Sequence, residues 1–149
     1  MTKFLLSVHV LAAIIAIGPV TVAASMFPPA ARRALAAPDD HRATGTVALL
    51  HRICQVYATF GVVVPVFGLA TGSAMGVLGD TWLITSIVLT VLAAAVLMAL
   101  VLPRQSTLAE GRGSRETTVQ LAMFTGVFNL LWATVTVLMI VRPGSTTGA

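Results

Sequence analysis

The chain has 149 residues, of which 57% are hydrophobic and 9% are charged, and its mean hydropathy is +0.95. An average soluble domain carries about 25% charged residues, so this composition excludes an ordinary water-soluble domain. The net charge is +4, but the Lys and Arg residues lie between apolar runs rather than along one face, which argues against nucleic acid as a partner. The single cysteine, Cys54, excludes an intramolecular disulfide.

Four apolar runs are each long enough to cross a bilayer as a helix. A hydrocarbon core of about 30 Å requires roughly 20 residues at 1.5 Å per residue. We predict spans over residues 4–25, 48–79, 81–103 and 117–141, within one integral membrane domain covering residues 1–149. The predicted fold class is therefore all-α, a polytopic bundle of four transmembrane helices.

The first run has some features of a secretory signal peptide, because a lysine precedes it and small residues end it. However, it is longer than a signal core, and two arginines follow it, where positive charge opposes translocation. We therefore predict an uncleaved helix. It should be kinked at Pro19 and ended by Pro28-Pro29, because proline cannot donate a helical hydrogen bond.

The second run is preceded by Asp39 and Asp40, either of which can cap a helix and complement its dipole. Within the run, Gly68, Gly72 and Gly76 follow one another at four-residue spacing, which is a double GxxxG pattern. On one helix these glycines would form a groove that lets a neighbouring backbone approach closely. A phosphate-binding loop is excluded, because no lysine follows the glycines and they lie in an apolar run.

The third and fourth runs have recognisable ends. A tight turn at Asp80 precedes the third run, and Trp82 lies where an interfacial anchor is expected. Residues 104–116 are polar and contain glycine, which predicts a loop. Ser114 is a suitable N-cap for the fourth helix, and Glu116 supplies an acid in its first turn.

The distribution of arginine predicts the orientation. The first and third connections, with the helix ends beside them, are rich in arginine, whereas the second connection contains only an acid, Asp80. By the positive-inside rule, we predict that the first and third connections are cytoplasmic and that both termini lie outside. The expected location is a cell membrane, of the bacterial plasma-membrane type. The arginines concerned are Arg32, Arg33, Arg42, Arg52, Arg104, Arg112 and Arg115.

A few polar side chains fall inside the predicted spans, and such residues are candidates for function. They are His9 in the first span, His51, Gln55 and Tyr57 in the second, and Asn129 in the fourth. His51 and Gln55 share a helix face. Asn129 shares its face with other polar or aromatic residues, and we predict that this stripe faces the bundle interior. The other members are Thr125, Trp132 and Thr136.

The two intramembrane histidines suggest a shared haem or metal, but the topology opposes it. His9 lies near the outer surface and His51 near the inner one, so their imidazoles should be about 15 to 20 Å apart along the membrane normal. His9 with Met139 or Met75, at a more similar depth, would suit haem b or copper. Alternatively, His9 bonds a carbonyl or Asn129 of a neighbouring helix, and the methionines are packing residues.

No carboxylate lies inside the predicted spans, so a buried acid and base pair or a proton-carrying carboxylate cannot be named. Two hypotheses remain. The first is a non-catalytic bundle or accessory subunit, whose partners are the lipid bilayer and other membrane subunits or further copies of the chain. The second is a haem- or copper-binding protein with a redox or metal-handling role through His9.

Three stretches carry a family resemblance: LLSVHVLAAIIAIGPV, LLHRICQVYATFGVVVPVFGLATG and FNLLWATVTVLMIVRPG. They resemble the integral membrane proteins grouped as domain of unknown function family 2269, which implies a four-helix bundle without an assigned activity. They are more distantly similar to the copper-resistance D and membrane protoporphyrinogen oxidase group, which implies haem binding with His9 matching its first-helix histidine. That group has a glutamate where this chain has His51 before Arg52, and its third-span lysine and histidine are missing here.

Overall fold

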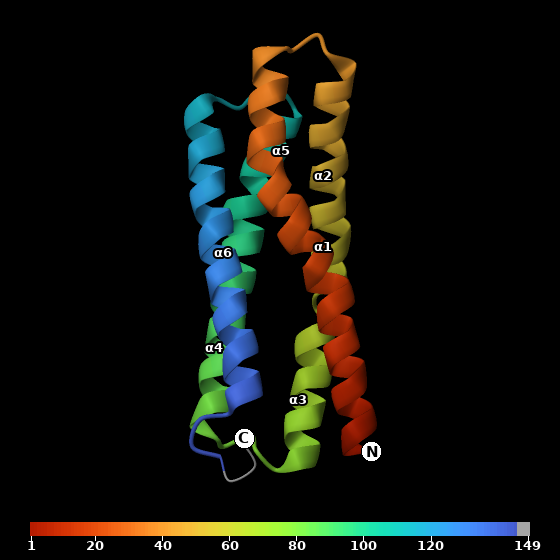
Figure 1. Ribbon diagram of the computed structural model, residues 1–149, viewed down its shortest axis with the longest axis vertical. Helices are drawn as coiled ribbons and strands as arrows, with labels where there is room; N and C mark the ends of the chain where they lie inside the picture. Colours follow the sequence, from red (N-terminus) through yellow and green to blue (C-terminus); the bar gives the residue numbers. More distant parts are fainter. Residues whose placement is uncertain (146–149) are drawn as a thin grey trace.

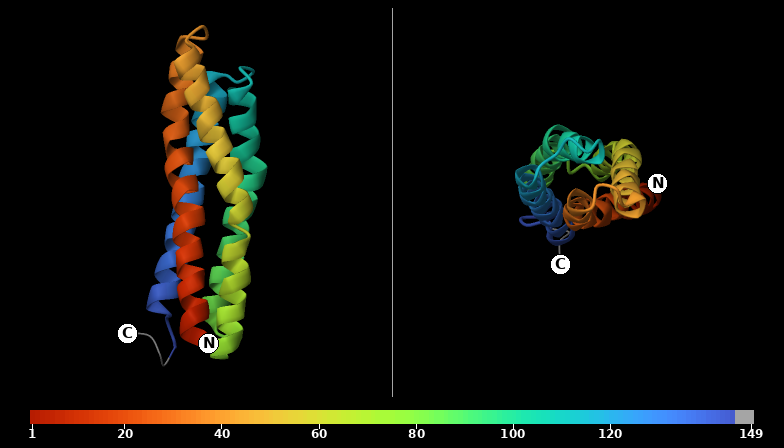
Figure 2. Two further views of the ribbon diagram at one scale, coloured as in Figure 1. Left: turned by 90° about the vertical axis from the view of Figure 1, so that its right-hand side faces the viewer. Right: turned by 90° about the horizontal axis from the view of Figure 1, so that it is seen from above.

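The computed structural model describes residues 1–145, which form helices joined by short turns. Long helices run side by side along one axis, and they surround a common centre when seen from above (Figures 1 and 2). The predicted fold class is confirmed, because four helices are long and apolar enough to cross a membrane. These helices are Thr2–Ala36, His41–Met75, Thr81–Ala109 and Arg115–Val141.

Helix α1 (Thr2–Ala36) is longer than the sequence predicts. It continues through Pro28 and Pro29 to Ala36, so the prediction that this pair ends the helix is wrong. Proline in a helix interior costs about 3 kcal/mol relative to alanine. Pro28 itself is buried and Phe27 beside it is fully buried, so side-chain packing at this level favours the continued helix.

Helix α2 (His41–Phe60) is capped by Asp40, one of the two caps that the sequence predicts. The Asp40 carboxylate accepts hydrogen bonds from the backbone N–H groups of Arg42, at 2.9 Å, and Ala43, at 3.4 Å. This cap satisfies donors that have no partner inside the helix. The turn between α1 and α2 is short, since it comprises only residues 37–40.

Helix α3 (Val63–Met75) continues the direction of α2 after an interruption at Gly61 and Val62. Pro65 has no N–H to offer the Gly61 carbonyl, which instead accepts from Val64 N at 3.2 Å. The second membrane-spanning segment is thus two helices joined by a proline-induced break.

The third long helix contains α4 (Thr81–Ala95), a π-helical segment η1 (Val96–Val101) and α5 (Leu102–Ala109). Leu102 N bonds the carbonyl of Leu97, five residues earlier, and this wide turn lies directly before Pro103. The helix continues to Ala109. The predicted loop over residues 104–116 is therefore wrong for its first six residues.

Helix α6 (Arg115–Val141) has the predicted N-terminus. Ser114 and Thr117 cap each other's backbone N–H groups, and Glu116 lies in the first turn. The helix ends at Arg142, which adopts a left-handed conformation with φ of 46°.

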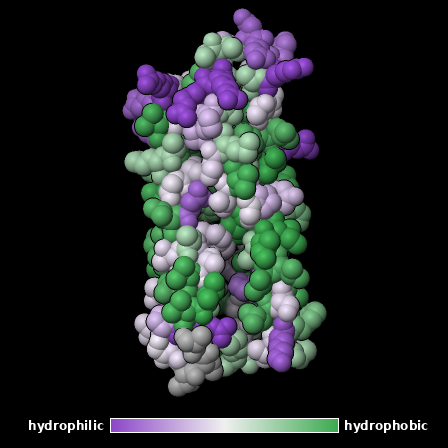
Figure 3. Space-filling view, in the orientation of Figure 1, coloured by the Kyte–Doolittle hydropathy of each residue, from purple (hydrophilic) through white to green (hydrophobic). Residues whose placement is uncertain are grey.

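The main hydrophobic core cluster extends from the middle of the bundle toward the end that carries most arginines. Figure 3 shows hydrophilic side chains gathered at that end and a broad hydrophobic surface below it. Helix α1 packs on α2, α3 and α6, and α4 packs on α6, whereas α3 and α4 touch little. Figure 3 accordingly shows a crevice in the lower half. Large core side chains near the arginine-rich end are Phe27, Val47, Leu50, Val101 and Leu121.

Candidate functional site

His9 links α1 to α3 through a buried hydrogen bond. The side chain is 9% exposed, and Nδ1 lies 2.9 Å from the carbonyl oxygen of Val64. A carbonyl only accepts, so Nδ1 carries the proton and donates it. Nε2 has no hydrogen-bond partner within residues 1–145. His9 therefore bonds a carbonyl, one of the two hydrogen-bonded alternatives that the sequence left open.

The imidazole of His9 rests directly on Gly68. A Cβ at Gly68 would lie 2.9 Å from Cε1 of His9, and one at Gly72 would lie 2.9 Å from Cδ2 of Leu83. Two of the three glycines thus accommodate side chains rather than a neighbouring backbone. Gly76 is the C-cap of α3, with φ of +71° and nothing near its missing side chain. The predicted glycine groove is wrong in this respect.

A second polar cluster lies near the arginine-rich end. His51 Nδ1 donates to Gln105 Oε1 at 3.2 Å, and Gln105 Nε2 donates to Cys54 Sγ at 3.4 Å. Gln105 and Cys54 are both 0% exposed. The cluster joins α2 to α5. Its amide satisfies groups that would otherwise be buried without partners.

Gln105 was missed because the sequence placed it in a loop. Leu97, Val101 and Gln105 follow one another at four-residue spacing, and all three are buried. This spacing was the signal in the sequence that could have placed Gln105 on the inner face of a helix. In a regular α-helix, residues spaced by four drift slowly around the axis. The π-helical segment widens the turn and keeps them on one side, a change that α-helical periodicity does not predict.

His9 and His51 occupy separate sites. His9 bonds Val64, which lies thirteen residues after His51 along α2 and α3, or about 20 Å at the helical rise. His51 is held by Gln105 instead. One metal ion cannot reach both imidazoles, because axial ligands approach it to about 2 Å.

Gln55 and Tyr57 lie outside the His51 cluster. Gln55 is exposed, and its amide has no hydrogen-bond partner within the described part of the chain. Tyr57 is half-buried, with its ring centroid 6.4 Å from that of Phe60. An open groove of about 200 Å³ lies beside Gln55, and its other lining residues are Ala58, Thr59, Met98 and Leu102.

Asn129 joins α6 to α1, where its Nδ2 donates to Ser25 Oγ at 3.1 Å. Its Oδ1 is buried without a partner, and so is Oγ1 of Thr125, whose side chain is 3% exposed. Thr136, in contrast, is exposed. The predicted interior stripe is therefore wrong at Thr136. The stripe faces the bundle at Thr125 and Asn129 but not at Thr136.

The two candidate methionines lie at the same end of the bundle as His9. Met75 is in the last turn of α3 and Met139 near the end of α6, and both are half-buried. Their role as ligands stays a prediction. Within residues 1–145, no group of three or more His, Cys, Asp or Glu side chains is arranged to hold a metal ion.

Trp82 is held by polar neighbours at this end. Its Nε1 donates to Asp80 Oδ2 at 3.0 Å, and the Arg142 guanidinium lies 5.6 Å from the ring centroid. Trp82 is mostly buried, so it fastens the start of α4 to the end of α6. The predicted interfacial anchor is thus also a packing residue.

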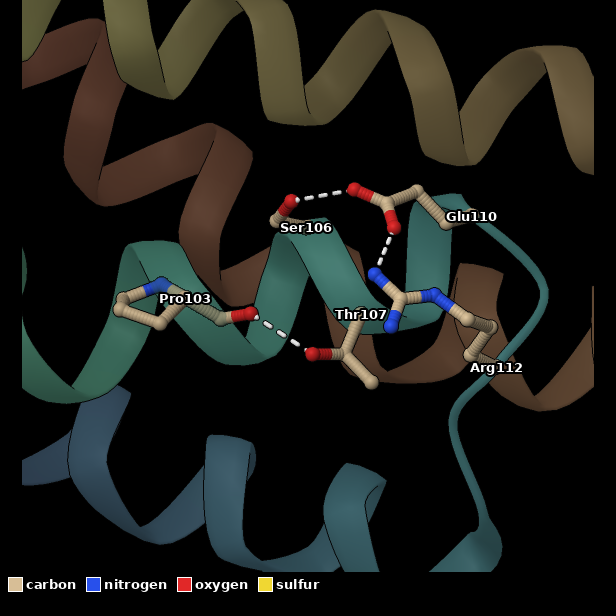
Figure 4. Close-up of polar contacts among 5 residues, drawn as sticks. All are labelled: Pro103, Ser106, Thr107, Glu110 and Arg112. Carbon is tan, nitrogen blue, oxygen red and sulfur yellow. Dashed lines mark hydrogen bonds and ion pairs between the residues drawn. The ribbon is translucent and has the colours of Figure 1, made fainter.

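The loop after α5 contains an ion pair between Glu110 and Arg112. Glu110 accepts from Arg112 and, at 2.9 Å, from the Ser106 hydroxyl, while Thr107 donates to the Pro103 carbonyl (Figure 4). The Arg112 guanidinium and the Ser106 hydroxyl hold the pKa of the Glu110 carboxyl below its ordinary value. Both charged side chains are largely exposed, so the pair orders the loop rather than forming a reactive site.

No protein-family model, curated protein or solved structure matches the chain.

Proposed function

We propose that the protein is a non-catalytic membrane bundle that serves as an accessory subunit of a membrane complex. Its interior polar groups have structural uses. Thr71 and Ser86 donate to carbonyls of their own helices, and Gln105 joins α2 to α5. None of these groups forms an acid and base pair of the kind that catalysis requires.

The observation that carries the proposal is the outward amide of Gln55. Thr59 Oγ1 donates to the Gln55 backbone carbonyl at 2.9 Å, but the Gln55 side chain has no partner within residues 1–145. In membranes, amide side chains stabilise helix association by hydrogen bonding across the contact, and small residues beside them permit close approach. Ala58 and Thr59 provide that space, and a partner helix in the adjoining groove would complete the hydrogen bonds of Gln55.

The proposal is tested by native mass spectrometry of the protein extracted in mild detergent. We expect a stoichiometric complex, with another subunit or a second copy, that Gln55→Leu dissociates because leucine fills similar space without an amide. Thr134→Val is the matched control, since the Thr134 hydroxyl bonds only the Leu130 carbonyl of its own helix and lies outside this groove. A monomeric wild-type protein, or equal loss in both variants, would contradict the proposal.

A second candidate function is haem or copper binding through His9. The supporting observation is the donor bond from Nδ1 to Val64, because histidines that ligate metals usually donate their other ring nitrogen to a carbonyl or carboxylate. Nε2 is left as the ligand atom. Met139, Met75 and Asn129 are the candidate companions, in agreement with the more distant family resemblance.

The second candidate is tested by the absorption spectrum and metal content of the purified protein. We expect a Soret band or stoichiometric copper in the wild type and its loss in His9→Asn, which keeps a donor for the Val64 carbonyl but removes Nε2. His41→Asn is the control, because His41 is exposed at the start of α2. A colourless, metal-free wild type would rule out this function.

A further inference from the structure

The end of the first helical hairpin contains an open groove of about 470 Å³. It lies between the last turns of α1 and the first turns of α2. Alanines from both helices form much of its wall, and its polar lining residues are Arg33, Asp40, Arg42 and Thr46. The small wall residues leave room for a ligand to reach the arginines.

The two arginines of the groove have no anionic partner. Within residues 1–145, the ion pair is between Arg112 and Glu110, and neither Arg33 nor Arg42 donates a side-chain hydrogen bond. Arg104 differs, because Gln120, the Leu100 carbonyl and the Phe124 ring hold its guanidinium. The groove therefore presents two uncommitted guanidinium groups.

Asp40 is the acid in the groove, and one of its two carboxylate oxygens caps α2. Oδ1 accepts from the N–H groups of Arg42, at 2.9 Å, and Ala43, at 3.4 Å. Thr46 donates its hydroxyl to the Arg42 carbonyl at 2.8 Å. Two cations thus face one capped carboxylate, which leaves the groove net positive. Its positive groups suit a compact anion with several acceptor oxygens.

The position of the groove agrees with a ligand from the membrane surface or the adjoining water. Helix α1 has 35 residues, so it is about 52 Å long, against a hydrocarbon core of about 30 Å. With the first span ending near Ser25, the groove begins at Ala30, roughly 8 Å beyond the hydrocarbon. The headgroup layer of each leaflet is about 5 to 8 Å thick, so the groove opens at its outer edge.

We propose that this groove binds a phosphate group through Arg33 and Arg42, carried either by an anionic phospholipid or by a small phosphate compound. Guanidinium forks match phosphate oxygens in pairs, and two of them in one groove can hold a single phosphate. The proposal is independent of the proposed function, because it uses neither Gln55 nor His9.

Both sources are tested on the full-length protein in detergent. Native mass spectrometry after incubation with phosphatidylglycerol measures lipid retention, and calorimetric titration with inorganic pyrophosphate measures the soluble anion. We expect Arg33→Gln/Arg42→Gln to weaken binding of the preferred ligand at least about tenfold, because charged hydrogen bonds are lost. Arg32→Gln/Arg52→Gln removes the same charge outside the groove and should change binding less than about twofold.

A second variant keeps both arginines. Ala36→Asp places a carboxylate in the groove wall and should also weaken binding, while thermal unfolding checks that the bundle remains folded. Retention of phosphatidylglycerol alone identifies the lipid as the source, and a pyrophosphate isotherm identifies the soluble anion. Equal losses in the groove and control double variants, or no binding of either probe, would overturn the proposal.

Discussion

Asn129 on α6 donates a hydrogen bond to Ser25 on α1, with Nδ2 and Oγ 3.1 Å apart. The two residues are 104 positions apart in the chain, so this bond joins the last membrane-spanning helix to the first. Interhelical hydrogen bonds of this kind in membranes contribute about 0.6 kcal/mol on average and up to about 2 kcal/mol. The contact closes the ring of helices visible from above (Figure 2).

Removing the acceptor of this bond should loosen the contact between α1 and α6. We expect Ser25→Ala to lower the free energy of unfolding by about 1 kcal/mol, because the Asn129 amide loses its partner. Unfolding in mixed micelles measures the change. Ser7→Ala is the matched control, since the Ser7 hydroxyl bonds only the Lys3 carbonyl of its own helix. A larger effect in the control would contradict this assignment.

Gly68 should be essential for the position of His9. A methyl group at Gly68 would lie 2.9 Å from the imidazole, so Gly68→Ala should move the ring and cost about 1 to 3 kcal/mol of unfolding free energy. The imidazole NMR signals of His9 should shift as well. Gly126→Ala meets nothing within 4 Å and should stabilise α6 by up to about 1 kcal/mol. If both variants behave alike, the contact is not specific.

Gln105 should matter more for stability than Gln55. Gln105→Ala opens space in the core and removes the partner of the His51 Nδ1–H, so we expect a loss of about 2 kcal/mol or more. Gln55→Ala should stay within about 0.5 kcal/mol in the isolated monomer, because this side chain is exposed. Thermal unfolding of both variants in one detergent makes the comparison. Equal losses would place Gln105 outside the core.

The carboxyl of Glu110 should titrate below the ordinary pH for a glutamate. Its pKa is lowered in the folded state, chiefly by Arg112, so the small stabilisation is present above the unfolded pKa and lost as pH falls through the folded pKa. Carbon-13 NMR of the carboxyl should show a midpoint that rises in Arg112→Gln. Arg115→Gln, which lacks contact with Glu110, should leave it unchanged. An identical midpoint in wild type and Arg112→Gln would exclude the ion pair.

Local signals in the sequence predicted the helices and several of their ends. Apolar runs of sufficient length predicted four spans, because a bilayer leaves a backbone few alternatives to helix. Asp40 and Ser114 act as N-caps as expected, since a cap depends on residues within one turn. His9 was found as a candidate because an ionisable residue inside an apolar run is conspicuous.

Tertiary packing decided the features that depend on distant residues. Pro28 remains helical because it is buried in the core, and Gly68 seats the imidazole of His9 from another helix. Gln105 is buried because a π-helical turn keeps it on the inner side, opposite Cys54. Composition and the length of the apolar runs thus determined the number and approximate positions of the long helices, whereas contacts between helices determined which polar side chains meet, because those contacts join residues that are far apart in the chain.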